Sequence, residues 1–131
     1  MNTLRNRTES VRCPPENLTS VYERVVVDAR SFVESWNGEL YLVYLPIWTR
    51  YGAPEEACDY SGDILLHDGV IQLARSVGLP VIDLTEDFDN LPDPLVAWPY
   101  GLNGHYSEEG YRLVANRVLS ELNALEKLRG R

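Results

Sequence analysis

Apolar residues recur at three- and four-residue steps in three stretches of the chain, and such a period predicts amphipathic helices. Asn37-Gly38 closes the first stretch, and we expect the glycine to adopt the left-handed conformation that ends a helix. Ser107 precedes the last stretch and is a favourable N-cap residue. The expected helices cover residues 16–37, 63–77 and 107–128.

Two short apolar runs, rich in residues that favour strands, lie between the predicted helices. They cover residues 40–46 and 80–85, and runs of this length are typical of strands buried on both faces of a parallel sheet. A strand, a helix and a strand in this order form a βαβ unit with parallel strands. We interpret residues 47–62 and 86–106 as loops, and the length of the second favours a functional role.

The predicted sheet is small for the helices around it. Open α/β sheets usually have about four or more strands, and two strands cannot cover the apolar faces of three helices. The open edges of so small a sheet also invite pairing with another chain. We therefore expect either a missing N-terminal segment or self-association to complete the sheet.

Composition narrows the class of protein. The 131 residues, 44% of them hydrophobic, suit one globular domain, and we expect a flexible arm over 1–15 followed by a domain over 16–131. The net charge of -8 argues against nucleic acid and anionic membranes as partners. No apolar run approaches the roughly 20 residues of a membrane span, and the polar start carries no secretory signal, which leaves the compartment open. Neither the spacing of Cys13 and Cys58 nor that of the acidic residues in the predicted loop over 86–106 matches a metal motif, so we expect no metal or cofactor.

The segment from Tyr100 to Ala115 reads YGLNGHYSEEGYRLVA, with His105 in a loop directly before the last predicted helix. This segment resembles the last conserved block of the SGNH/GDSL hydrolases. Residues 79–84, LPVIDL, resemble a strand two elements earlier in that family, and residues 40–46 resemble the strand that leads to a substrate-side loop. The resemblance implies an α/β fold of the three-layer, flavodoxin-like type, of which this chain would hold the C-terminal βαβ unit and closing helix.

The resemblance also implies a serine esterase or acyltransferase, in which His105 is the catalytic base for a serine. Trp48, Arg50 and Tyr51 follow the first strand, and Asn103 lies beside the histidine, so these four are candidate substrate-binding residues. Aromatic rings stack on sugars and arginine holds anionic groups, which favours a small-molecule or carbohydrate ester such as an O-acylated sugar. The alternative is loop packing, with the tryptophan over the core and the arginine paired to an acid.

The sequence departs from the family in three ways. The Gly-Asp-Ser block with the nucleophile and the Gly-x-Asn-Asp oxyanion block are absent, and Leu102 stands where the family has an acid three residues before the histidine. Such an acid holds the imidazole in the correct tautomer, and Asp89 or Asp93 could replace it. We expect the isolated chain to be inactive, and the alternative function is a non-catalytic binding or assembly module with the same fold. The other histidine, His67, lies within a predicted helix and is expected to be structural.

Overall fold

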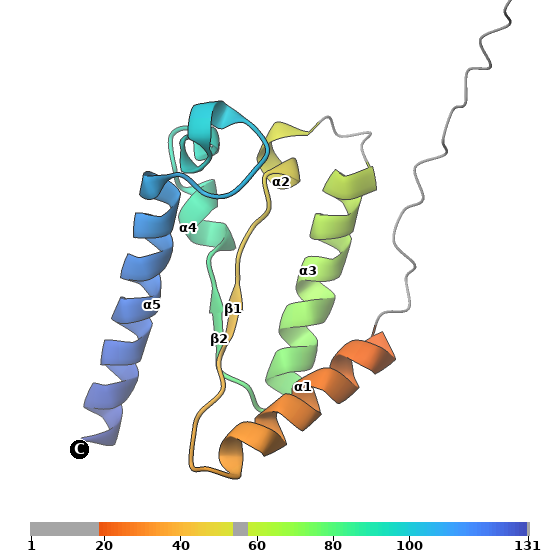
Figure 1. Ribbon diagram of the computed structural model, residues 1–131, viewed down its shortest axis with the longest axis vertical. Helices are drawn as coiled ribbons and strands as arrows, with labels where there is room; N and C mark the ends of the chain where they lie inside the picture. Colours follow the sequence, from red (N-terminus) through yellow and green to blue (C-terminus); the bar gives the residue numbers. More distant parts are fainter. Residues whose placement is uncertain (1–18, 54–57, 131) are drawn as a thin grey trace, which may run out of the picture.

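The computed structural model describes residues 19–53 and 58–130, and the chain is mostly helical with one small parallel sheet (Figure 1). The expected arm over 1–15 lies outside the described residues. The described elements are, in chain order, α1 (Thr19–Glu34), β1 (Leu42–Tyr44), α2 (Thr49–Gly52), α3 (Cys58–Ser76), β2 (Val81–Asp83), α4 (Thr85–Asp89), the short 3-10 helices η1 (Pro94–Ala97) and η2 (Pro99–Gly101), and α5 (Glu108–Arg129).

The two strands pair in parallel, as predicted, with Val43 opposite Ile82 in the register. The α3 helix makes the crossover between them, so the carboxyl ends of both strands reach the same end of the molecule, where α2, α4 and the loop before α5 gather (Figure 1). The prediction that the first strand is buried on both faces is wrong, because all three of its residues are only half-buried. A sheet of two strands leaves open edges, and its side chains stay partly accessible.

Helices cover both faces of this sheet, and each face has its own core. On one face Ile82 and Leu84 pack with α4, η1 and α5 around the fully buried Phe88. On the other face Leu42 and Val81 pack against α1 and α3 in a smaller cluster, whose buried members are Val26, Ala74 and Leu79. The alternation of side chains along each strand sends neighbouring residues to opposite cores.

The helix ends confirm one expectation and correct another. Ser107 caps α5, since its Oγ accepts a hydrogen bond from the backbone N–H of Gly110 at 3.1 Å. Gly78 ends α3 in the left-handed region with φ of 76°. After α1, however, the left-handed residue is Asn37, with φ of 59°, and not Gly38. Asparagine tolerates this conformation better than most residues, and the Gly38 N–H then bonds back to the Val33 carbonyl at 3.0 Å.

The segments interpreted as loops contain more helix than expected. Residues 47–62 hold α2 and the beginning of α3, which starts at Cys58 instead of residue 63, and residues 86–106 hold most of α4 and both 3-10 helices. A proline opens each of the 3-10 helices, and the Asp93 carboxylate accepts a hydrogen bond from Leu95 N–H to cap the first of them. Among the described residues, no helix combines the length and apolar character needed to cross a membrane.

Candidate functional site

A cavity of about 340 Å³ lies at the carboxyl ends of the two strands, between the exit of β1 and the loop before α5. It contains three of the residues singled out from the sequence, namely His105, Asn103 and Trp48. The other two of the five, Arg50 and Tyr51, do not line it. The complete lining is Leu45, Pro46, Ile47, Trp48, Trp98, Asn103, Gly104, His105, Tyr106 and Tyr111.

Two long-range hydrogen bonds join the two walls of this cavity. The Trp48 indole Nε1–H donates to the Gly101 carbonyl at 2.9 Å. The Tyr106 hydroxyl donates to the carbonyl of Pro46, a buried residue two positions after the end of β1. These bonds hold the loop that carries His105 against the exit of β1. Trp48 therefore has a structural role beside any contact with a ligand, as the packing alternative anticipated.

The start of α5 is fixed against η1 directly after the histidine. Ser107 donates from its backbone N–H to the Ala97 carbonyl at 2.8 Å and from its Oγ to the Val96 carbonyl at 2.9 Å. One turn later, a Cβ atom on Gly110 would lie 2.5 Å from the Ala97 carbonyl oxygen. Only glycine fits there without a backbone shift, and this accounts for the glycine in the His-Tyr-Ser-Glu-Glu-Gly segment. The result is a fixed exit for the chain two residues after His105.

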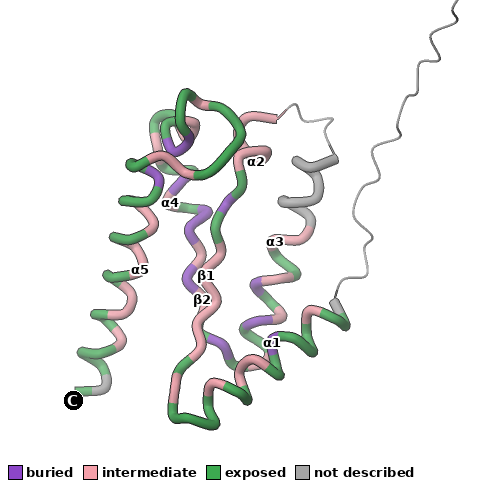
Figure 2. Tube along the Cα trace, viewed as in Figure 1, coloured by how far each residue is buried: buried purple, intermediate pink, exposed green. Residues whose placement is uncertain are grey.

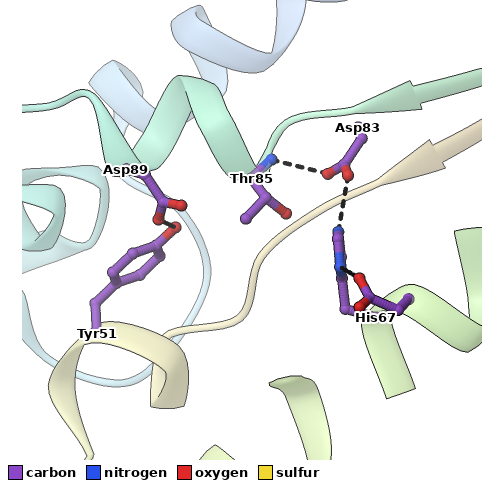
Figure 3. Close-up of polar contacts among 6 residues, drawn as sticks. Tyr51, His67, Asp83, Thr85 and Asp89 are labelled. Atoms are coloured by element: carbon purple, nitrogen blue, oxygen red, sulfur yellow. Dashed lines mark hydrogen bonds and ion pairs between the residues drawn. The ribbon is translucent and has the colours of Figure 1, made fainter. Parts of the chain in front are cut away.

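The His105 side chain is exposed, and within the described part of the chain it has no hydrogen-bond partner. Neither acid considered as its partner reaches it. Asp93 caps η1, and Asp89 accepts a hydrogen bond from the Tyr51 hydroxyl at 2.9 Å (Figure 3). Leu102, at the position of the family's acid, is itself exposed. The imidazole is therefore accessible and is not oriented by a carboxylate.

Tyr51 and Arg50 belong to the surroundings of the site. The Tyr51 ring stacks on Phe88 at 6.3 Å between centroids and touches Trp98 at 5.8 Å. Burial and the hydrogen bond to Asp89 raise the pKa of this tyrosine well above its usual value, so it remains a neutral donor. Its position favours packing over ligand contact. Arg50 is half-buried on α2, outside the lining of the cavity.

His67 forms a second polar cluster near the ends of the strands, and sequence reasoning assigned it no more than a structural role. Its Nε2 lies 2.7 Å from the Asp83 carboxylate at the end of β2, and its Nδ1 lies 2.9 Å from Asp68 (Figure 3). The edge of the ring also meets Tyr44, with centroids 4.7 Å apart. Since carboxylates only accept hydrogen bonds, both ring nitrogens are donors when the two acids are ionised, which is the imidazolium form.

The charges in this cluster stabilise one another. Burial by itself would lower the pKa of His67, but the hydrogen bonds to Asp68 and Asp83 outweigh burial and raise it above 6.5. Burial would likewise raise the pKa of Asp83, but the Thr85 N–H, which donates at 2.9 Å, and His67 lower it instead. With both nitrogens occupied, His67 has no lone pair with which to act as a base. The cluster connects α3 to β2, and these contacts are consistent with the structural role expected for His67.

The described residues offer no nucleophile to His105. No serine hydroxyl in them is hydrogen-bonded to its ring, and Ser107, the nearest serine in sequence, is occupied at both the cap of α5 and the Val96 carbonyl. Nor do His, Cys, Asp and Glu side chains gather into a metal-binding group anywhere in the part of the chain that the structure describes. The site thus consists of an accessible imidazole in an aromatic cavity.

Comparisons of the chain with protein-family models, with curated proteins and with solved structures found no match.

Proposed function

We propose that this chain carries the histidine side of an SGNH/GDSL-like hydrolase site, in which His105 transfers protons during ester hydrolysis or acyl transfer. The observation that carries the proposal is the cavity that brings His105, Asn103 and Trp48 together at the carboxyl ends of parallel strands. Open α/β sheets bind their ligands at this end. A general base needs a free ring nitrogen that a substrate or nucleophile can approach, and His105 has one.

In this proposal the described residues form the C-terminal portion of a three-layer, flavodoxin-like fold. Helices on both faces of the sheet and open strand edges support it. Further strands would extend the sheet, and the loops at their carboxyl ends would supply the nucleophilic serine and the oxyanion donors. Those strands belong to a preceding segment or to another chain.

The lining of the cavity favours an uncharged ester as the ligand. Four aromatic side chains and three aliphatic ones surround His105, and no Asp, Glu, Lys or Arg is among the lining residues. A volume of about 340 Å³ suits a small ligand such as one sugar ring with an acyl group. The aromatic rings would hold the sugar face, and the Asn103 amide would bind a hydroxyl or carbonyl oxygen. We therefore propose an O-acylated carbohydrate as the substrate class.

Ligand binding can be tested on the chain without any nucleophile. In an isotope-labelled sample, an O-acetylated methyl glycoside at millimolar concentration should shift the NMR signals of the His105 ring and the Trp48 indole. The same glycoside without acetyl groups should shift them much less. Trp36 is the internal control, because its side chain is exposed and it is not among the residues that line the cavity. Equal shifts at Trp36 and Trp48, or no shifts, would contradict the proposed site.

Catalysis is tested by asking whether the chain contains its own nucleophile. The isolated protein should hydrolyse p-nitrophenyl acetate no faster than the His105→Ala variant, and a fluorophosphonate probe should not label it. Turnover that the substitution abolishes would show that the nucleophile lies within these 131 residues. An in-frame Gly-Asp-Ser block upstream in the gene would instead identify the missing part of the site.

The second candidate is a non-catalytic module that keeps the fold and binds a ligand. The observation in its favour is the exposed leucine at position 102, where the family has an acid. Leu102→Asp should restore the orienting hydrogen bond if the loop keeps the family's geometry, and nitrogen chemical shifts of the His105 ring should then report one fixed tautomer. Leu102→Asn is the uncharged control. An unchanged tautomer mixture in Leu102→Asp would favour the binding module.

A further inference from the structure

The α1 helix has two apolar faces, and the described chain covers one of them. On the inner face Tyr22 and Val26 pack against α3 and the segment before β2. On the outer face Val21, Val25 and Phe32 are 65%, 58% and 70% exposed. In Figure 2 most of the α1 trace is exposed or intermediate, whereas the trace of α3 includes several buried positions. A row of large apolar residues at this exposure is typical of an interaction surface.

The spacing of the outer face is that of a helix–helix seam. Val21, Val25, Asp28 and Phe32 follow one another at steps of four, three and four residues. This is the heptad pattern by which one helix lies along another. The seam is apolar at both ends and carries a carboxylate in the middle. A partner must therefore provide apolar contacts flanking a positive charge.

The positive charge that fits is on the same helix. Arg24 and Asp28 are four residues apart and both exposed, yet the described residues give neither of them an ion-pair partner. The pair Arg30 and Glu34, also four residues apart on α1, does close an ion pair at 2.7 Å. On α5 the pairs at the same spacing close too, at 2.6 Å for Arg112–Glu108 and 2.9 Å for Arg117–Glu121. Arg24 and Asp28 thus keep two opposite charges available beside an apolar seam.

We propose that the outer face of α1 binds the same face of a second copy of the chain. The two helices run antiparallel, and the two-fold axis crosses them at the level of residue 26 along the helix. This axis brings Val25 against the partner's Val25 and Val21 against the partner's Phe32. It also pairs Arg24 with the partner's Asp28, and symmetry repeats that pair on the opposite side of the axis. A two-fold interface must be self-complementary, and this helix carries both halves of each contact.

The charge pair supplies the specificity of this dimer. Each chain has a net charge of -8, which opposes association, but salt screens charges beyond roughly 8 Å at physiological ionic strength. In the antiparallel arrangement each Asp28 carboxylate meets an Arg24 side chain of the other copy. A parallel or shifted arrangement would instead bring the two Asp28 carboxylates together. Apolar contacts then hold the helices together, and the charges select the antiparallel register.

The experiment measures the mass of the full chain by analytical ultracentrifugation over a range of concentrations. The wild-type protein should sediment as a dimer of twice 14.9 kDa. Val25→Glu should raise the dissociation constant by about 100-fold or more, because two carboxylates then meet at the axis. Its circular dichroism should match wild type, since the Val25 side chain is exposed in the monomer. Glu23→Ala, on an exposed residue of α1 away from the seam, is the matched control and should leave the constant unchanged.

A charge swap tests the register itself. Arg24→Glu alone should weaken the dimer by about tenfold, and so should Asp28→Arg alone. The double variant should recover the wild-type constant to within about threefold, because the pair is rebuilt with its signs exchanged. A wild-type monomer at all concentrations would overturn the proposal, as would a Val25→Glu dimer of undiminished stability. A double variant as weak as the singles would overturn the antiparallel register.

Discussion

The two faces of the sheet are closed to very different degrees. On the α5 side, Phe88, Trp98 and Tyr106 form a group of rings with centroids 5.3 to 5.7 Å apart, and the first two are almost inaccessible. On the α1 side, the described residues form a smaller buried cluster of Val26, Ala74 and Leu79, and Ile71 of α3 is buried as well. Among the described residues, the side with the candidate site therefore holds the larger and more aromatic core, whereas α1 also has large apolar side chains on its outer face.

Two phenylalanines give the largest expected contrast between the sides. Phe88 is 0% exposed and Phe32 is 70% exposed. Phe88→Ala should lower the free energy of unfolding by about 3–5 kcal/mol, because it removes a buried ring and leaves a cavity. Phe32→Ala should change it by less than about 0.5 kcal/mol at concentrations where the chain is monomeric.

Urea denaturation followed by circular dichroism measures both values, and dilution separates folding from association. A large decrease in the free energy of unfolding of the dilute Phe32→Ala monomer would mean that the Phe32 side chain is buried within the monomer.

Two helical glycines provide the next contrast. A Cβ on Gly110 would press on the Ala97 carbonyl oxygen, whereas a Cβ on Gly69, in α3, would meet no atom within 4 Å. Gly110→Ala should cost about 1–3 kcal/mol of unfolding free energy, because α5 must move away from η1. Gly69→Ala should stabilise the protein by about 0.5–1 kcal/mol through helix propensity alone. Thermal denaturation distinguishes the two, and equal effects would mean that the close approach of α5 to η1 is absent.

The His67 cluster lies on the α3 side of the sheet, and its effect should depend on pH. Since the pKa of His67 is raised, its contribution is complete below 6.5, the ordinary value, and is lost as the pH rises through the raised pKa. Since the pKa of Asp83 is lowered, its contribution is present above 3.8 and is lost as the pH falls through the lowered pKa. His67→Gln should therefore cost most between these values, by about 1 kcal/mol, and progressively less above them.

The measurement is the free energy of unfolding of wild type and His67→Gln from pH 4 to 9. Arg50 and Tyr44 lie near the ring in both proteins, so their own contributions cancel in the difference. A difference independent of pH would show that the imidazole is not charged in the folded state.

The smallest expected effect concerns the backbone of Tyr100, a non-glycine residue with a positive φ on the α5 side of the sheet. Tyr100 has φ of 57° and a side chain that is almost entirely exposed. Tyr100→Gly should stabilise the protein by about 0.5 kcal/mol, because glycine adopts a positive φ without a steric cost. Tyr100→Ala keeps that cost and should bring no gain. A melting temperature that rises equally in both variants would assign the effect to the ring and not to the backbone.

The sequence predicted the elements with a clear period and missed the short ones. Long amphipathic repeats located α1 and α5, and two apolar runs located the parallel strands. The α2 and α4 helices are too short to show a period, and both depend on packing against the strands' carboxyl ends. Pro94 and Pro99 were usable signals for η1 and η2, since proline fits the first turn of a helix.

The site was predictable in part for the same reason. Trp48 and His105 could be brought together because one follows a strand end and the other precedes the last helix. The turn of α2, which sends Tyr51 into the core, depends on the ring of Phe88 in the tertiary structure. The pairing of His67 with Asp83 depends on how α3 lies over β2, which no local pattern encodes.

The two hydrogen bonds across the cavity also have a consequence for the order of folding. They join residues 53 and 60 positions apart, so each closes a long loop whose entropy must be lost before the bond contributes. The α5 helix and its Ser107 cap are local and can form early. The walls around His105 can meet only after the βαβ unit has assembled, so the cavity should be the last part of the molecule to acquire native protection against hydrogen exchange.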